Sequence, residues 1–281
     1  MLSYRALTQS VSSPGHTHTL SIQASESERA ETCWSFLQYH AIVEHALGVL
    51  CAVLRTDLGN HVTVENFYKN LCTKECLRCG GFGGFVFLPS FTRCCFDCLQ
   101  KASDFRMMSF SAAKKRLGKS LQQYQSSIPI LHTLPGIYSV EESSRKRRIR
   151  PVPEEQVTRK LLQIQGLSAE DSPTHPIVKE VIPNTSRFMA ATAMPWLDVG
   201  RCSVQYGVSC KGCQVAIEKN VSIDFEARDW VFSKDGFLEH YQSCTEAREL
   251  WKASCGGTIP FDEPELTKRG GCMNDRNDDN P

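Results

Sequence analysis

Two cysteine pairs in one short stretch constrain this chain more than any other feature of its sequence. Cys76 and Cys79 form one C-x-x-C pair, Cys95 and Cys98 form a second, and 15 residues separate the two pairs. Each pair can present two thiolates to one tetrahedral ion at about 2.3 Å, and the intervening segment can return as a hairpin. This spacing predicts a four-cysteine structural zinc site.

The residues around these pairs suit such a site. The backbone can turn sharply after the first pair, because glycine occupies four of the next five positions: Gly80, Gly81, Gly83 and Gly84. The apolar stretch "FVFL" that follows predicts a strand, and the residues from Leu99 onward predict a helix. We therefore expect a treble-clef-like order of knuckle, hairpin and second knuckle opening a helix.

Two further cysteines lie beside this cluster and could substitute as ligands. Cys94 adjoins Cys95, and Cys72 precedes Cys76 by four residues. We prefer Cys95, which alone makes the two-residue spacing to Cys98, and interpret Cys72 and Cys94 as small buried residues. A redox pair is disfavoured because no thioredoxin-like βαβ unit precedes Cys76. The GGFGG stretch lacks the lysine of a P-loop and the spacing of a dinucleotide fingerprint.

A second set of zinc-like ligands lies near the carboxyl end. Cys210 and Cys213 form a C-x-x-C pair, and 26 residues separate Cys213 from His240 in a helical pattern that presents His240 and Cys244 one turn apart. We expect one helix here, capped by Ser233, with an apolar face carrying the aromatic residues Phe237, Tyr241 and Trp251. The alternative is an amphipathic core helix that includes a histidine and a cysteine by chance.

The remaining cysteines are weaker candidates. Cys202 could substitute as a ligand of the second set, whereas Cys255 and Cys272 are expected beyond the folded unit. The chain has 14 cysteines in 281 residues. It begins without a secretory signal pattern, and its longest apolar run, "ALGVLCAVL", is too short to span a bilayer. We therefore expect a reducing compartment, cytoplasm or nucleus, no membrane contact, and metal ligation rather than disulfides.

Composition and pattern predict an α+β protein of small, mostly helical, zinc-stabilised modules with short hairpins and long irregular segments. We expect a disordered leader (1–30), a helical region with the four-cysteine cluster (31–140), a basic, proline-containing linker (141–185), a second zinc-like module ending in a helix (186–255) and a disordered tail (256–281). Helices are expected over 32–54 as one or two segments, over 64–71 with Thr63 as N-cap, on both sides of Gly118, and over 154–167 within the linker. The segments "VSIDF" and "DWVF" are expected to be extended.

The stretches "LCTKECLRCGGFGGFVFLPSFTRCCFDCLQ", "ILHTLPGIYS", "MPWLDVG", "GVSCKGCQ" and "FSKDGFLEHYQSC", in this order over residues 46–252, resemble fungal F-box-containing proteins with cysteine-rich bodies. F-box proteins are adaptors of cullin–RING ubiquitin ligases, so the resemblance implies a target-recognition body with a Skp adaptor and cullin subunits as partners. The chain departs from the family at the F-box itself: no Leu-Pro-x-Glu opening occurs, and Pro14 is the only proline before Pro89.

Two function classes follow. The first is a non-enzymatic, zinc-stabilised protein-interaction protein, because closed four-ligand sites leave no coordination position for a substrate and no nucleophile signature can be assigned. The alternative is a nuclear nucleic-acid-binding or regulatory protein, because "RKRRIR" (145–150) could contact phosphates or an import receptor. Overall net charge, +1 from 32 basic and 31 acidic residues, gives no general attraction to a polyanion, so any such contact must be local.

Overall fold

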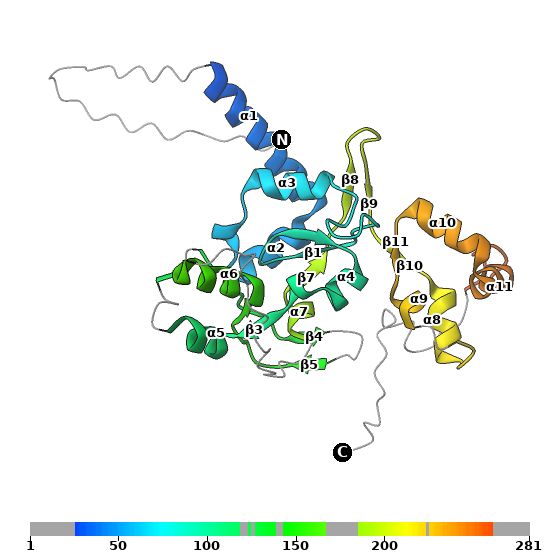
Figure 1. The fold of residues 1–281 in the computed structure, drawn as a ribbon. Coiled ribbons are helices and arrows are strands. Elements are labelled where there is room, and N and C mark those ends of the chain that lie inside the picture. The colour runs from blue at the N-terminus through cyan, green and yellow to red at the C-terminus, as the bar shows by residue number, and fades with distance from the viewer. Residues whose placement is uncertain are drawn as a thin grey trace.

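A computed structural model describes residues 26–118, 123–124, 127–138, 143–166, 185–222 and 225–260 (Figure 1). Helices and short antiparallel sheets alternate along the chain, which confirms the predicted α+β class. Most of the predicted leader and tail, together with Cys272, lies outside the described residues. The leader prediction nevertheless extended too far, because a helix already begins at Glu26.

Three helices form the amino-terminal part: α1 (Glu26–His45), α2 (Leu47–Arg55) and α3 (Val64–Cys72). The Thr63 hydroxyl accepts a hydrogen bond from the Asn66 amide at 3.1 Å, which confirms the predicted N-cap of α3. The helical segment predicted over 32–54 is present as α1 and α2, which ends at Arg55, and the short 3₁₀ helix Gly59–His61 follows. In the described part of the chain no single helix is long and apolar enough to cross a membrane. Among the described residues, only Trp34–His45 and Leu47–Arg55 taken together are long and apolar enough for a membrane span, and these two segments are bent by 96° relative to each other.

A three-stranded sheet of order β2–β1–β7 lies at the centre of the molecule. Strands β1 (Phe85–Phe87) and β2 (Thr92–Cys94) form the predicted hairpin, and β7 (Ala191–Ala193) pairs with the other edge of β1. The main core packs around this sheet and includes Val86, Phe87 and Met194. Residues 186–197 therefore belong to the central unit. The expectation that they open the second module is corrected, because their apolar side chains are buried against β1.

A smaller layer packs beside the central sheet. It contains α4 (Phe96–Lys101), the 3₁₀ helix Ser103–Phe105, β3 (Met107–Ser109), α5 (Phe110–Leu117), β4 (Gly136–Tyr138), β5 (Ser143–Arg145), β6 (Pro151–Pro153), α6 (Glu154–Gln165) and α7 (Thr185–Met189). Strand β3 pairs with β6 and β4 with β5. Helix α5 ends at Leu117 with Gly118 as its C-cap, which agrees with the predicted break, but most of the second helix predicted after it lies outside the described residues.

The prediction of a linker over 141–185 is wrong for the described residues 143–166. Val152 and Val157 are fully buried, and β6 and α6 form a core with Met108 and Leu117. Two of the prolines in the expected linker, Pro151 and Pro153, stand at the two ends of the short edge strand β6, where a missing backbone N–H is tolerated. Pro173, Pro176 and Pro183 lie outside the described residues. The helix predicted within this segment is present as α6.

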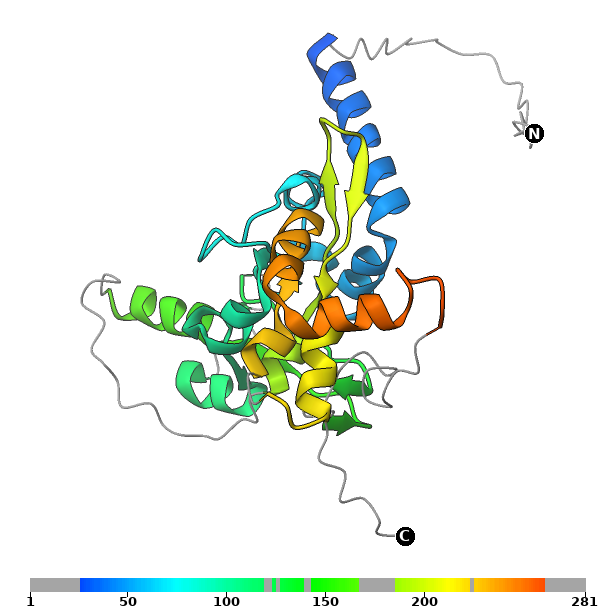
Figure 2. The ribbon, with the colours of Figure 1, turned by 90° about the vertical axis from the view of Figure 1, so that its right-hand side faces the viewer.

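The carboxyl-terminal helices form a group beside the central unit in Figure 1, and this group faces the viewer in Figure 2. The hairpin β8 (Trp196–Asp198) and β9 (Ser203–Gln205) leads into β10 (Val208–Ser209), α8 (Lys211–Glu218), α9 (Phe225–Asp229), β11 (Val231–Phe232), α10 (Lys234–Ser243) and α11 (Thr245–Ala253). We call residues 208–253 the C-terminal module. Val231 of this module packs closely against Gly84 of the central unit. A Cβ atom added to Gly84 would lie only 3.0 Å from Val231 Cγ1.

Two details of this module differ from the sequence prediction. The single helix expected from Ser233 to Trp251 is two helices, because Cys244 ends α10 and its sulfur caps α11. Trp251 consequently leaves the predicted apolar face and is 53% exposed. Phe225, the last residue of the segment "VSIDF" that was expected to be extended, begins helix α9. In the second predicted segment, "DWVF", Val231 and Phe232 are extended and form β11.

Candidate metal centres

The structure brings the sulfurs of Cys76, Cys79, Cys95 and Cys98 within 4.8 Å of one another. The first pair comes from the turn before β1, and the second pair from the end of β2 and the first turn of α4. Cys79 and Cys95 Sγ atoms lie 3.6 Å apart. The hairpin β1–β2 thus returns the chain so that the two pairs face each other, as the spacing predicts. We call this group the first centre.

Local backbone bonds shape the first knuckle. The Cys76 amide donates to the Gly81 carbonyl at 2.6 Å, and the Gly80 amide donates to the Cys76 carbonyl at 2.9 Å. Gly80 has φ +73°, in the left-handed region that favours glycine. Gly83 is needed for a different reason, since a Cβ there would lie 2.8 Å from Arg93 Cγ and 3.1 Å from the Cys76 amide nitrogen. Two of the four glycines are therefore dictated by backbone geometry.

Helix α4 positions the second pair. Cys95 is its N-cap, and the Cys95 sulfur accepts a hydrogen bond from the Cys98 amide at 3.3 Å. A helix amino terminus favours a negative charge, so it stabilises a thiolate at this position. At the other end, buried Arg187 of α7 donates to the Leu99 carbonyl at 3.0 Å and also to the Gln100 carbonyl. The helix that carries two ligands is thereby held at both ends.

The neighbouring cysteines lie outside this group. Cys94 is completely buried, and burial raises the pKa of its thiol. Cys72 is half-buried, with a thiol pKa that burial also raises, and its carbonyl accepts a hydrogen bond from Trp196 Nε1 at 3.2 Å. Neither sulfur belongs to the converging set. Their placement agrees with the interpretation of both as small packing residues.

The second centre contains Cys210, Cys213, His240 and Cys244, whose ligand atoms also lie within 4.8 Å of one another. Cys213 Sγ lies 3.4 Å from His240 Nε2 and 3.8 Å from Cys244 Sγ. The distance between the sulfurs of Cys210 and Cys244 is 3.9 Å. The 26-residue gap thus closes, and α10 delivers its histidine to the knuckle before α8.

The amino-terminal ends of α8 and α11, and the close approach of these two helices, position the residues of the second centre. Cys210 stands at the N-cap position of α8, and the Cys244 sulfur accepts a hydrogen bond from the Ala247 amide at 3.4 Å. Gly212, between the two knuckle cysteines, lets α8 approach α11, because a Cβ there would lie 2.4 Å from the Ala247 nitrogen. The His240 ring stacks on Phe232 at 4.6 Å, which fixes its orientation. Sequence reasoning missed Gly212, although a glycine inside C-x-G-C is a visible signal of close packing.

Hydrogen bonds between the closely spaced sulfurs shift the pKa values of their thiols. A hydrogen bond from the Cys95 thiol lowers the pKa of Cys76 to about 4, and the same bond raises the pKa of Cys95. A bond from Cys213 likewise lowers the pKa of Cys210 to about 5 and raises the pKa of Cys213. Burial raises the pKa of Cys98 to about 11. Several anionic sulfurs at such distances repel one another unless a cation lies between them.

The distances fit a tetrahedral metal ion. With metal–sulfur bonds of about 2.3 Å, neighbouring sulfurs of a tetrahedron lie about 3.8 Å apart, and a sulfur and an imidazole nitrogen lie about 3.5 Å apart. The observed sulfur pairs at 3.6, 3.8 and 3.9 Å and the sulfur–nitrogen pair at 3.4 Å lie close to these values. A disulfide would need about 2.05 Å. Each centre could therefore hold one metal ion.

The other cysteines predicted as weaker candidates stay apart from both centres. Cys202 is exposed in the turn between β8 and β9, and its thiol contacts the Val199 carbonyl at 3.6 Å. It does not reach the second centre. Cys255 is also exposed, in the turns that follow α11. The possibility of Cys202 as a substitute ligand is therefore removed.

A buried arginine that the sequence did not single out ties the first centre to the rest of the core. Arg93 of β2 is 2% exposed, and burial lowers its pKa to about 10. Its guanidinium donates to the carbonyls of Asn70 at 2.8 Å, Pro195 at 3.0 Å and Met194 at 3.1 Å. These bonds join α3, the hairpin that bears the ligands, and the segment after β7. Only the tertiary structure reveals this role.

Comparison of the chain with protein-family models, characterised proteins and solved structures finds no match. The chemistry assigned to this protein therefore rests on the two centres and on the surfaces of the described residues.

Proposed function

We propose that the protein is a non-enzymatic protein-interaction protein whose fold two zinc ions stabilise. The observation that carries this proposal is the convergence of two complete sets of four ligands, each drawn from two segments of the chain. Four protein ligands complete a tetrahedral zinc ion and leave no position for a substrate or an activated water. Thiolate and imidazole ligands in this arrangement are those that structural zinc takes.

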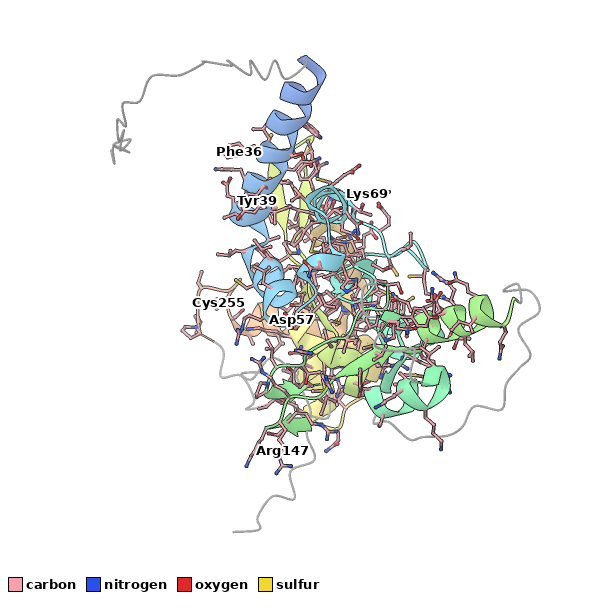
Figure 3. All side chains as sticks on the ribbon, turned by 90° about the vertical axis from the view of Figure 1, so that its left-hand side faces the viewer. Phe36, Tyr39, Asp57, Lys69, Arg147 and Cys255 are labelled. Carbon is pink, nitrogen blue, oxygen red and sulfur yellow. The ribbon has the colours of Figure 1, made fainter. Side chains whose placement is uncertain are left out.

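An interaction role is supported by the outer surface of α1. Phe36 and Tyr39 are 67% and 49% exposed, and Val43 continues the same stripe one turn further along. Figure 3 shows Phe36 and Tyr39 on the side of α1 that faces away from the rest of the molecule. Exposed aromatic side chains in a group are typical of contact surfaces.

The resemblance to fungal F-box proteins gives the proposal its specific form. In that form the chain is the target-recognition body of a cullin–RING ubiquitin ligase adaptor, with a Skp adaptor and cullin subunits as partners. Cytoplasm or nucleus is the corresponding location, because twelve described cysteines are free and both centres require reduced sulfurs.

Two measurements test the two halves of this proposal. Elemental analysis of the protein purified under reducing conditions is expected to give about two zinc ions per chain. Cys98→Ser and Cys210→Ser should each remove one, whereas Cys255→Ser should keep both. A folded, metal-free protein would overturn the zinc assignment.

Affinity purification from the native organism tests the ligase connection. Skp and cullin subunits are expected to copurify with the wild-type chain and with Cys255→Ser. Recovery of other proteins without Skp or cullin, at normal zinc content, would exclude the ligase role and leave the zinc-stabilised interaction role standing.

A further inference from the structure

The strongest local charge on the described surface is the run Arg145–Arg150. Five of its six residues are basic, although the whole chain has a net charge of only +1. Lys146, Arg147, Arg148 and Arg150 are exposed. Figure 3 shows Arg147 at the periphery, at the end of the molecule opposite to Phe36. This charge is therefore concentrated on one end of the protein.

The backbone of this run is held in place. The Thr133 amide donates to the Ile149 carbonyl at 3.1 Å, and the Ile149 amide donates to Thr133 Oγ1 at 2.9 Å. On one side Arg145 pairs with Gly136 across β4 and β5, and on the other side the buried strand β6 begins at Pro151. A nuclear-import receptor would need a free, extended peptide, whereas this segment is bonded into the fold.

The positive surface continues onto α5. The Arg150 guanidinium lies over the Phe110 ring, 4.3 Å from its centroid. Phe110 begins α5, and exposed Lys114 lies one helical turn further along, on the same face. Stacking on Phe110 fixes Arg150 between the run and the helix. We call Lys146, Arg147, Arg148, Arg150 and Lys114 the basic track.

Within the described part of the chain Lys146, Arg147 and Arg148 form no ion pair. The two acidic residues that open α6 have other partners, because Glu154 pairs with Arg116 and Glu155 with Arg159. The basic track is therefore available to an external anion.

We propose that the basic track binds the phosphate backbone of a nucleic acid without reading its sequence. Arginine predominates in the track, and its guanidinium matches phosphate oxygens with two parallel hydrogen bonds. Lys146, Arg147, Arg148 and Arg150 lie within five consecutive residues, so several can contact neighbouring phosphates of a linear polyanion. The two hollows lined by Phe96 and Trp230 and by Cys213 and His240 include no residue of the track, and a uniformly charged chain, unlike an acidic peptide, needs no side-chain pocket.

Fluorescence anisotropy with a labelled single-stranded oligonucleotide of mixed sequence tests this proposal. Binding should weaken steeply with salt. The double variant R147Q/R148Q removes two phosphate contacts, and should reduce the slope of log K against log salt by about 1.4 and the affinity at ~0.1 M salt by about 25-fold. The matched control is K69Q/K252Q, which removes two exposed charges elsewhere on the surface and should bind as the wild type does.

Three outcomes would overturn the proposal. The first is an absence of salt-dependent binding at ~50 mM salt, where phosphate contacts are strong. The second is equal loss of affinity in both double variants, which would indicate general charge rather than the track. The third is binding of a poly-glutamate peptide as tight as that of an oligonucleotide of equal charge, which would assign the track to acidic proteins. Circular dichroism and zinc content should be unchanged in both variants, so these results are independent of the two metal centres.

Discussion

The two candidate metal centres have the same number of ligands but very different surroundings. The first centre lies at the edge of a core of 21 buried residues, and two of its own cysteines, Cys76 and Cys95, belong to that core. The buried cluster at the second centre has three described members, Cys210, Cys244 and Ala247, and two of them are candidate ligands. Half-buried aromatic residues pack against it, and Val215, Ala216 and Ile217 of α8 are buried outside this cluster. Apolar burial can hold much of the central unit together, whereas the C-terminal module buries a much smaller set of apolar side chains.

This difference indicates two roles for one kind of site. Where a large core already exists, a bound metal ion would join segments that other contacts also hold, including the hydrogen bonds of Arg93 and Arg187. Where the core is small, the binding free energy of a metal ion would supply a large part of the folding free energy of the module. The following predictions test this contrast, from the largest expected effect to the smallest.

Loss of the second metal should have the largest effect. His240→Ala opens the second centre, and we expect amide-exchange protection to be lost over 208–253, because structural zinc contributes on the order of 10 kcal/mol in small modules. Amides of β1, β2 and β7 should stay protected. Phe237→Ala is the matched control, since this side chain is only half-buried beside His240 and its truncation leaves all four ligands in place. If Phe237→Ala removes more protection than His240→Ala, the module is held by packing and not by metal.

Loss of the first metal should be milder. Cys98→Ser is expected to remove one zinc ion, to abolish protection around residues 76–81 and in α4, and to lower the free energy of unfolding by about 4 kcal/mol. Cooperative unfolding of the central unit should remain, because its core is intact. Thermal unfolding with zinc analysis measures both effects. Complete unfolding of the central unit in Cys98→Ser would remove the contrast between the two centres.

A methyl group added at position 212 should push helices α8 and α11 of the C-terminal module apart. The Cβ of Gly212→Ala would overlap the backbone at Ala247, so we expect a loss of about 1–3 kcal/mol and weaker zinc binding at the second centre only. Gly48→Ala is the matched control, because nothing lies within 4 Å of its added Cβ in α2 and the change should be neutral or stabilising by up to about 1 kcal/mol. Competition with a metal chelator reports affinity. Unchanged zinc affinity in Gly212→Ala would show that the approach of α8 to α11 is dispensable.

The cysteines outside both centres should matter least. Cys202→Ser and Cys255→Ser alter exposed thiols in turns, so we expect changes within about 0.5 kcal/mol and full zinc content. Denaturant unfolding and elemental analysis measure these quantities. Loss of one zinc ion in Cys202→Ser would place this cysteine in the second centre and contradict the geometry described above.

Some features of the protein follow from the sequence by itself. The eight residues that converge in the two centres were predicted from the spacing of C-x-x-C and H-x-x-x-C, because a turn or a helix brings ligands at these spacings to one point. The Thr63 and Ser233 caps were also predicted, since a cap depends on the next three residues alone. The F-box resemblance and the ligase partners remain predictions from sequence.

Other features were decided only by the tertiary structure. Strand β7 pairs with β1 across about a hundred residues, and β6 pairs with β3 although its prolines indicated a linker. Helices α10 and α11 divide at Cys244, where the sulfur both faces the second centre and caps the next helix. The carbonyls that Arg93 and Arg187 contact lie far from them in the chain. Local spacing limits where a ligand can point, but which distant strand covers an apolar face depends on burial, and burial is a property of the whole fold.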